Sequence, residues 1–431
     1  MKGKRFPRLG ENCYELTLEN GLTVCVILRP GFVKTYAMFA TGYGGMNLRY
    51  RMDGEMQESP AGVAHFLEHK MFDTKEGNAL QILSANGASP NAFTAADITA
   101  YYFDCTQRFA ENLRVLLSFV SRPYFTPESV EKEQGIIGQE IRMIEDNPDW
   151  CLYQNLLRAL FRHHSLRIPI AGSVESIAEI TDDILYRCHK AFYCPGNMVL
   201  CVVGNVDPEQ VVKIAREVLP TEKSTVAEKD PGQAEPEFSE RERITVEMEV
   251  SAPNFLLGFK APPHPEGEAD LRLQLLGELA GEILTGESSP LYARLYGAGL
   301  IDKSFSVSYE SYPGAAFLML GGESERPEAV FEALLEEGDR IRREGVDRDL
   351  FRRCKKAAYG FRVRALNAME HASVQLVRGR LKGYHYYRFP ELYDTINPED
   401  VQCFLTDLIC RERAALSVVR PMERNGTEVM E

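Results

Sequence analysis

Two histidines and a glutamate lie close together in the chain, at His65, Glu68 and His69. If this segment is a helix, residues four apart lie on one face, and both imidazoles can bind one metal ion. Glu68 then lies on the adjoining side of the helix, beside the metal and not on it. The order His-x-x-Glu-His is the inverted zincin motif, the inverzincin signature of zinc peptidases.

These residue types suit the hydrolysis of a peptide bond. Zinc binds imidazole nitrogens and carboxylate oxygens, keeps one position for water, and lowers the pKa of that water to about 7. A carboxylate beside the metal can take the proton of the water as it attacks a peptide carbonyl. We therefore predict one zinc ion per chain on His65 and His69, with Glu68 as the catalytic base. Cobalt or manganese would also fit such ligands.

A zinc site of this kind needs a third protein ligand, which should come from another helix. A cap at Thr126 and Pro127 predicts a helix over about residues 128–145. Glu133 and Glu140 on this helix are seven residues apart, so they share a face. One could bind the metal and the other could support a ligand, and the spacing alone does not choose between them.

The elements that must position these residues alternate between strands and helices in the first half of the chain. Hairpin signals, such as Asn20-Gly21, are too frequent for a purely parallel sheet. Strands are predicted at 14–28 (a hairpin), 35–40, 99–104 and 198–203, and helices at 60–72, 78–86, 108–120, 128–145, 182–192 and after 208.

The same order of elements begins again after a stretch rich in Lys, Glu, Pro and Gly. This repetition indicates a divergent duplication in which the second copy has lost the histidines. We predict a metal-binding domain at 1–221, a linker at 222–241, and a second homologous domain without the metal motif at 242–431. In the second copy, strands are predicted at 244–250, 255–259, 305–309, 316–320 and 414–419, and helices at 271–283, 291–296, 327–342 and 348–364.

Composition indicates a folded protein of the cytoplasm. The chain has 431 residues, more than one ordinary core, and 44% of them are hydrophobic. It contains no apolar run near 18 residues and no signal peptide, and its ten cysteines form no CxxC pair. The net charge of −14 argues against nucleic acid and anionic membranes as partners.

With these motifs in place, the sequence resembles the M16 family of metallopeptidases, the pitrilysin and mitochondrial processing peptidase group, and in particular its short two-domain bacterial members. The resemblance rests on segments 62–69, 87–94, 133–141 and 193–198. It implies an α+β fold of two homologous repeats, each a mixed, mainly antiparallel sheet with helices on one face, which form half of a closing chamber. It also implies that Glu140 is the metal ligand and that Glu133 supports the site.

The resemblance further implies how a peptide substrate would bind. An unfolded or leader-type peptide would add as an extended strand at a sheet edge formed by Asn91, Ala92, Phe93 and Thr94. The alternative for Asn91 is a turn residue whose side chain caps its own backbone. Isolated histidines such as His385 are expected to have no role in the site.

One departure from the family concerns the Arg and Tyr that stabilise the oxyanion of the substrate. Arg294 and Tyr296 are out of register with that pair. The resemblance therefore implies a heteromeric partner of the same fold that supplies this Arg–Tyr pair, which we call the clamp. A homodimer would hold two metals and no clamp. Arg378 and Tyr384 could substitute, or could lie at a surface helix end. The rival function is a non-catalytic scaffold subunit.

Overall fold

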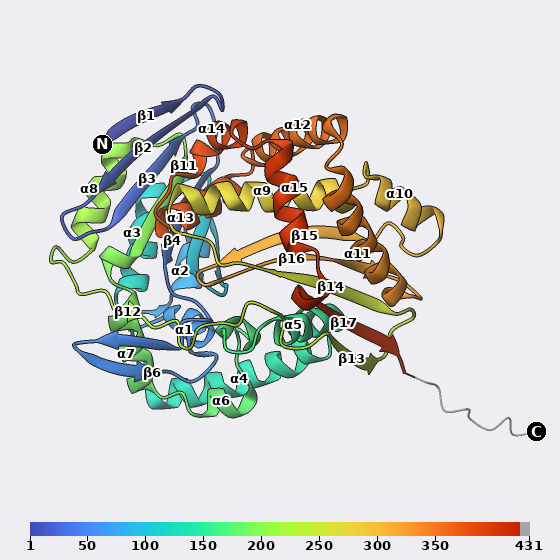
Figure 1. Ribbon diagram of the computed structural model, residues 1–431. Coiled ribbons are helices and arrows are strands. Elements are labelled where there is room, and N and C mark those ends of the chain that lie inside the picture. The colour runs from blue at the N-terminus through green and yellow to red at the C-terminus, as the bar shows by residue number, and fades with distance from the viewer. Residues whose placement is uncertain (423–431) are drawn as a thin grey trace, which may run out of the picture.

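The first half of the chain forms a seven-stranded sheet in the computed structural model, which describes residues 1–422 (Figure 1). The strand order is β1-β2-β3-β11-β4-β10-β9, and β11 pairs in parallel with β3 while the other neighbours are antiparallel. The strands are β1 Lys2–Phe6, β2 Glu11–Thr17, β3 Thr23–Leu28, β4 Thr35–Thr41, β9 Ala88–Thr94, β10 Thr99–Cys105 and β11 Met198–Gly204.

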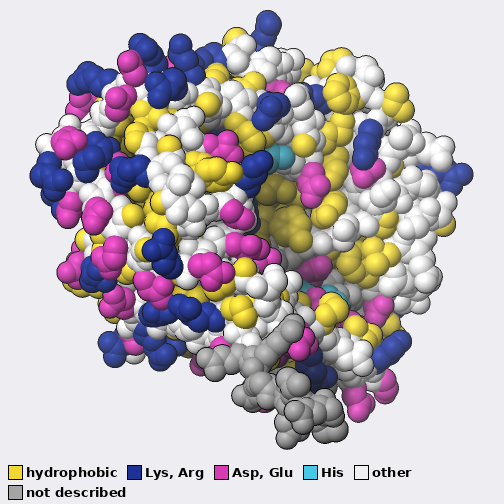
Figure 2. Space-filling view, turned by 90° about the vertical axis from the view of Figure 1, so that its right-hand side faces the viewer, with side chains coloured by type: hydrophobic (Ala, Val, Ile, Leu, Met, Phe, Trp, Pro, Cys, Tyr) yellow, Lys and Arg dark blue, Asp and Glu magenta, His cyan; other side chains and the backbone are white. Residues whose placement is uncertain are grey.

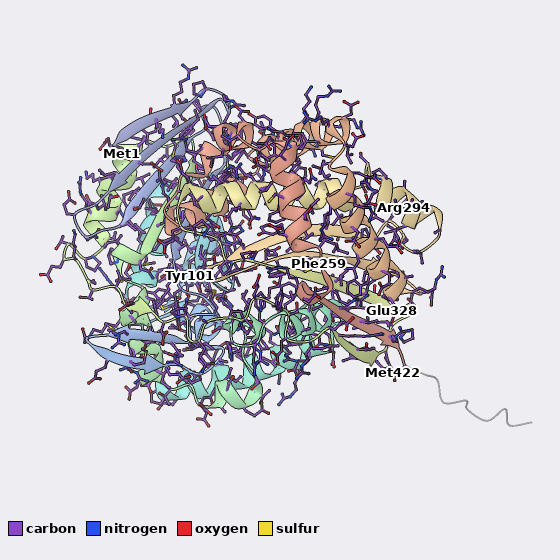
Figure 3. All side chains as sticks on the ribbon, in the orientation of Figure 1. Met1, Tyr101, Phe259, Arg294, Glu328 and Met422 are labelled. Atoms are coloured by element: carbon purple, nitrogen blue, oxygen red, sulfur yellow. The ribbon has the colours of Figure 1, made fainter. Side chains whose placement is uncertain are left out.

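Most helices of the first half lie on one face of this sheet. Tyr101 on β10 lies in their shared core, where it is fully buried among residues of α1, α3 and α7 (Figure 3). The helices are α1 Val63–Met71, α2 Ala79–Ala85, α3 Phe109–Ser121, α4 Pro127–Glu145, α5 Pro148–Leu160, α6 Val174–Ala178, α7 Asp182–Phe192 and α8 Pro208–Val218. Shorter strands complete this half: β5 Arg49–Met52, β6 Glu55–Glu58, β7 Asp73–Thr74, β8 Gly77–Asn78 and β12 Glu228–Lys229.

The second half repeats this arrangement around a five-stranded sheet with the order β13-β17-β14-β16-β15. Its parallel pair, β13 with β17, stands where β3 and β11 stand in the first sheet. The strands are β13 Arg243–Met248, β14 Asn254–Ala261, β15 Ser306–Tyr312, β16 Ala315–Glu323 and β17 Ala414–Pro421. The helices are α9 Glu268–Thr285, α10 Pro290–Gly297, α11 Pro327–Glu344, α12 Arg348–Ala365, α13 Met369–Leu381, α14 Phe389–Asp394 and α15 Pro398–Leu408. The predicted α+β fold of two homologous repeats is confirmed.

The two halves exchange one helix each, and the sequence did not predict either helix. α5 belongs to the first half but packs on β14 and β17 of the second sheet. α13 belongs to the second half but packs on β11 and β4 of the first sheet (Figure 1). Gly258 on β14 allows this contact, because a Cβ there would lie 2.9 Å from Leu160 on α5. Each sheet is thus covered on one face by its own helices and on the other by a helix from the other half.

The segment between the two sheets is anchored through Glu235. Its carboxylate accepts hydrogen bonds from the backbone N–H groups of Arg162, His163 and His164 at 2.7–2.8 Å. It also accepts one from Lys260 Nζ at 2.6 Å. The exact domain boundaries stay a prediction, but this contact ties residues of both halves to one buried carboxylate. Among the described residues, no helix combines the length and apolar character that crossing a membrane requires.

Candidate metal site

The helix with the two histidines is held at its start by a glycine. Gly62 precedes α1 with φ of 96°, and a Cβ at this position would lie 2.5 Å from Ala171 O. Only glycine fits both the backbone conformation and the close approach. Phe66 and Leu67 on α1 are fully buried in the core. The apolar side of the helix therefore packs inward, and its other side carries His65, Glu68 and His69.

The second helix of the site, α4, brings Glu140 to the two histidines. Glu140 Oε1 lies 3.6 Å from His65 Nε2, and Glu140 Oε2 lies 3.6 Å from His69 Nε2. Ile137 and Ile141, which flank this region of α4, are buried in the same core as α1. The structure thus brings together three side chains from two helices, with one ligand atom of each within 4.8 Å of the others.

The spacing of these groups and the neutral state of His65 fit a zinc ion. Ligand atoms of a tetrahedral zinc, at bond lengths of about 2.1 Å, lie about 3.4 Å apart. The observed 3.6 Å separations are close to this value and exceed a normal hydrogen bond. Burial, and to a lesser extent the nearby His69, lowers the pKa of His65 to about 4. His65 is therefore neutral near pH 7, so that one of its nitrogens has a free lone pair for a metal.

Glu133 holds the ring of His69 from the opposite side. Its Oε1 lies 3.0 Å from His69 Nδ1, so Nδ1 carries the hydrogen and Nε2 faces Glu140 with its lone pair. Lys70, which is almost fully buried, lies 4.0 Å from Glu133 Oε2 and donates to Asp73 at 2.5 Å. The spacing of the glutamates left their roles open, but in the structure Glu140 faces both Nε2 atoms and Glu133 faces Nδ1. Lys70 was not singled out from the sequence, where it is one ordinary lysine.

Glu68 lies beside the ligand atoms, and one of its carboxylate oxygens accepts a hydrogen bond from a hydroxyl group. Thr94 Oγ1 donates to Glu68 Oε2 at 2.7 Å. Burial raises the pKa of Glu68, and the hydrogen bond from Thr94 partly offsets this rise. The carboxylate is therefore a stronger base than an exposed glutamate.

The predicted substrate strand is β9, the free edge of the first sheet. It pairs with β10 on one side only, and no other described strand covers its second side. The side chain of Ala92 packs against the hydrophobic core that contains α1, and that of Phe93 packs against the core that contains α13. Asn91 Oδ1 accepts a hydrogen bond from the backbone N–H of Ala92 at 2.8 Å. The alternative expected for Asn91, capping of its own backbone, thus occurs within the edge strand.

An apolar cavity of about 310 Å³ adjoins His65. Ile141, Ile144 and Trp150 form part of its wall, and Tyr312 from β15 of the second half contributes another part. This cavity could not be predicted from the sequence, because its wall combines residues from both halves. In the view of Figure 2, the surface is hollowed near its centre, where hydrophobic and acidic side chains gather.

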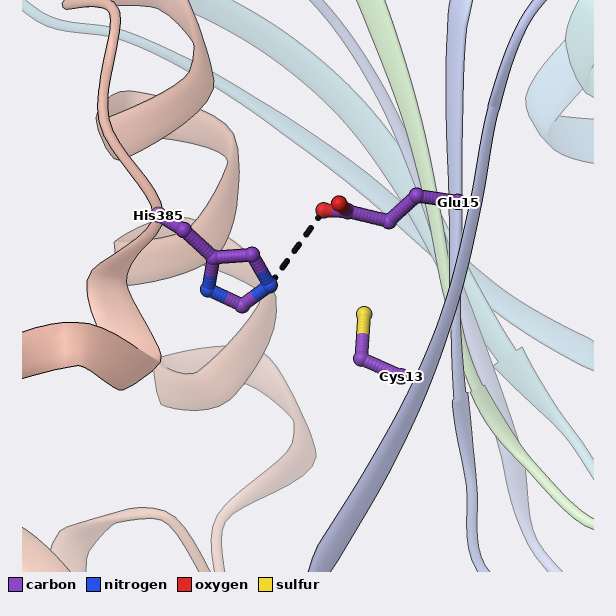
Figure 4. Close-up of side chains that lie close together, drawn as sticks. All are labelled: Cys13, Glu15 and His385. Atoms are coloured by element: carbon purple, nitrogen blue, oxygen red, sulfur yellow. Dashed lines mark ion pairs between the residues drawn. The ribbon is translucent and has the colours of Figure 1, made fainter. Parts of the chain in front are cut away.

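A second cluster of possible ligands, Cys13, Glu15 and His385, does not fit a metal (Figure 4). His385 was expected to be isolated, but its Nε2 lies 3.3 Å from Glu15 Oε1. The backbone N–H of Tyr387 donates to His385 Nδ1 at 3.1 Å, so the hydrogen of the neutral ring lies on Nε2. Arg380 Nε also donates to Glu15 Oε1 at 2.7 Å. The nitrogen that faces the cluster is therefore a donor, and the carboxylate is already paired.

The candidate clamp residues engage other partners. Arg294 lies on α10, at the side of the second half that is away from the first sheet (Figure 3), and contacts Glu337 at 3.2 Å. Tyr296 stacks on Tyr292. Arg378 lies 3.7 Å from Asp97.

Tyr384 had two alternatives, a clamp residue or a residue at a surface helix end. The residue is 8% exposed. It lies close after α13, and a Cβ on Gly379 of that helix would come within 3.0 Å of its ring. The expectation of a surface helix end is therefore wrong for Tyr384.

Two family models match successive parts of this chain. The model of the family "Insulinase (Peptidase family M16)" matches residues 53–174, and that of the "Peptidase M16 inactive domain" matches residues 179–358. An uncharacterized zinc protease of Bacillus subtilis, YmfH, is 38% identical over 432 residues, which cover 98% of this chain and 99% of the relative. An uncharacterized zinc protease of Rickettsia bellii is 29% identical over 66% of this chain and 67% of its own length.

Solved structures are similar over almost the whole chain. A putative M16-like peptidase from Alicyclobacillus acidocaldarius superposes with a TM-score of 0.92 at 33% identity, covering 95% of this chain and 98% of the other. A protease from Helicobacter pylori gives a TM-score of 0.82 at 16% identity, covering 95% and 99%, which shows the shared fold. The family models, the full-length relative and the fold agree, and the chain belongs to peptidase family M16.

Proposed function

We propose that this chain is a zinc endopeptidase subunit that hydrolyses unfolded or leader-type peptides. The observation that carries the proposal is the placement of His65, His69 and Glu140 around one point, with Glu68 beside them and not among them. A scaffold subunit has no need for such a set of buried ionisable groups, whose burial costs stability unless a partner compensates it.

Each residue has a defined task in the hydrolysis. Zinc bound by His65, His69 and Glu140 would polarise the peptide carbonyl and lower the pKa of the attacking water. Glu68 takes the proton of that water on a carboxylate oxygen and passes it to the nitrogen of the leaving amine. Glu133 keeps the hydrogen of His69 on Nδ1, which leaves Nε2 as the ligand atom.

The free edge of β9 and the apolar cavity support the proposed substrate class. A peptide that pairs with β9 must be extended, and its backbone must displace the side chain of Asn91 from the N–H of Ala92. The cavity beside His65 would take a large apolar side chain next to the scissile bond. Unfolded segments with such a side chain are the expected substrates.

The oxyanion of the substrate needs donors that this chain does not place at the site in the described residues. Arg294 is held by Glu337, and Arg378 lies beside Asp97. We therefore expect a heteromeric partner of the same fold that supplies an Arg and a Tyr, whereas a homodimer would be a weak peptidase. Adding the partner should raise the turnover of the purified chain; an unaided chain at full activity would remove the need for it.

The decisive experiment compares the wild-type chain with Glu68→Gln. Elemental analysis should find close to one zinc in both, because Glu68 does not touch the metal. Cleavage of an unfolded peptide should fall by about 10³-fold or more in Glu68→Gln, because the base is lost. Equal cleavage by both proteins would contradict the proposal, and a wild-type chain without metal or cleavage would favour the scaffold function.

A further inference from the structure

Thr94 ends the strand that would receive the substrate, yet its side chain is directed at Glu68. In the pairing of β9 with β10, Thr94 lies opposite Thr99, and Ala92 lies opposite the buried Tyr101. Thr94 and Ala92 therefore share the face of the strand that lies toward α1. Among the described residues, Thr94 is the one that donates a hydrogen bond to Glu68, at 2.7 Å.

The surrounding hydrogen bonds direct the hydroxyl hydrogen of Thr94 to Glu68. Thr99 Oγ1 lies 3.5 Å from Thr94 Oγ1, and it donates at 2.9 Å to the backbone carbonyl of Tyr43. The single hydrogen of Thr99 is thus used on Tyr43, and because an ionised carboxylate can only accept, the hydrogen between Thr94 and Glu68 comes from Thr94. A β-branched side chain in a strand also has few rotamers, so the position of Oγ1 follows that of the backbone.

We propose that Thr94 is a positioning residue that fixes the orientation of Glu68 and joins it to the substrate-binding edge. One oxygen of the carboxylate, Oε2, is held by the hydroxyl, which leaves Oε1 to receive the proton of the attacking water. Because Thr94 belongs to β9, a peptide that pairs with this strand also sets the position of the base. This inference rests on the proposed function, and it gives Thr94 a role other than the expected contact with the substrate.

The test separates positioning from substrate contact and from folding. Thr94→Val keeps the shape of the side chain and removes the hydroxyl, whereas Thr94→Ser keeps the hydroxyl. We expect Thr94→Val to lower kcat by about 10-fold at unchanged KM, and Thr94→Ser to restore most of the loss. Thr245→Val, which removes a hydroxyl from exposed strand β13, is the matched control and should cleave as the wild type does. All variants should bind the same amount of zinc.

A binding measurement gives a readout without catalysis. In the Glu68→Gln background, adding Thr94→Val should leave the Kd of a fluorescent unfolded peptide unchanged. Three results for Thr94→Val would each overturn the inference: weaker peptide binding, a raised KM at constant kcat, or an unchanged kcat. The proposed function would still stand in these cases if the wild type cleaves the peptide. A wild-type protein that cleaves no peptide, even at equimolar enzyme and with the partner subunit present, would overturn both.

Discussion

The clefts of the two halves are formed by corresponding helices and edge strands, but they hold different polar side chains. In the first half, α1 and α4 meet beside edge strand β9; in the second, α9 and α12 meet beside edge strand β15. The first cleft holds His65, His69 and Glu140 at separations too long for hydrogen bonds. In the second cleft, Glu278 on α9 is paired with Arg362 on α12.

In the second cleft, the polar groups form hydrogen bonds with one another. Gln274 donates to Glu278 Oε1 at 2.8 Å and to the carbonyl of Tyr309 on β15 at 2.9 Å. Arg362 also donates to Tyr386 at 2.9 Å. An arginine supplies the positive charge that the first cleft would take from a metal ion. The duplicated scaffold thus fixes the position of a polar cleft, while a few side chains decide whether it needs an ion.

The largest expected effect tests this difference directly. His65→Ala should reduce the zinc content to nearly zero and abolish cleavage, because two ligands do not hold the metal against the buffer. Gln274→Ala on the matching helix α9 should leave the zinc content unchanged. Elemental analysis of both proteins checks the prediction, and a loss of zinc in Gln274→Ala would mean that the two clefts are coupled.

A smaller effect concerns the backbone that presents the histidines. Gly62→Ala should destabilise the protein by about 3 kcal/mol, because its φ is positive and the new Cβ would lie 2.5 Å from Ala171 O. Gly299 after α10 also has a positive φ, of 64°, but no atom lies within 4 Å of an added Cβ. Gly299→Ala should therefore cost only about 1 kcal/mol. Denaturant unfolding of both variants measures the difference, and equal losses would show that the contact with Ala171 relaxes.

How far the sequence predicts this molecule depends on the range of the contacts involved. Residues 65, 68, 69, 133 and 140 could be selected because helical periodicity relates them at separations of three, four and seven positions. The hairpin around Asn20-Gly21 was predicted for a similar local reason, and β2 and β3 do pair there. Local pattern was therefore enough for the elements that carry the candidate site.

Contacts between distant parts of the chain were not predictable in this way. Nothing in the segments of α5 and α13 indicates that each packs on the sheet of the other half. The same holds for the cavity beside His65, which needs Tyr312 from the second half. Thr94 was singled out for its place in an edge strand, and only the structure shows that its hydroxyl is donated to Glu68.

A moderate effect is expected for the carboxylate behind His69. Glu133→Gln should weaken zinc binding by about 10- to 100-fold, because an amide holds the ring less firmly than a carboxylate and lowers the basicity of Nε2. Competition with a chelator of known affinity measures this change. The control is Glu131→Gln, an exposed residue on the same helix, which should bind zinc as the wild type does. If Glu133→Gln released the metal completely, Glu133 would be a ligand and Glu140 would need another role.

The smallest expected effect, close to none, concerns the cluster of Cys13, Glu15 and His385. Its histidine accepts a backbone hydrogen bond at Nδ1, whereas His69 donates from Nδ1 to Glu133. Only the second arrangement leaves Nε2 free for a metal. Replacing zinc by cobalt should therefore give an absorption spectrum without thiolate-to-metal charge transfer, and Cys13→Ser should not change the metal content. A thiolate band that disappears in Cys13→Ser would contradict this prediction. It would show that the hydrogen bond from Tyr387 to His385 breaks when an ion binds. The direction of the hydrogen bond at Nδ1 would then not be enough to distinguish the two clusters.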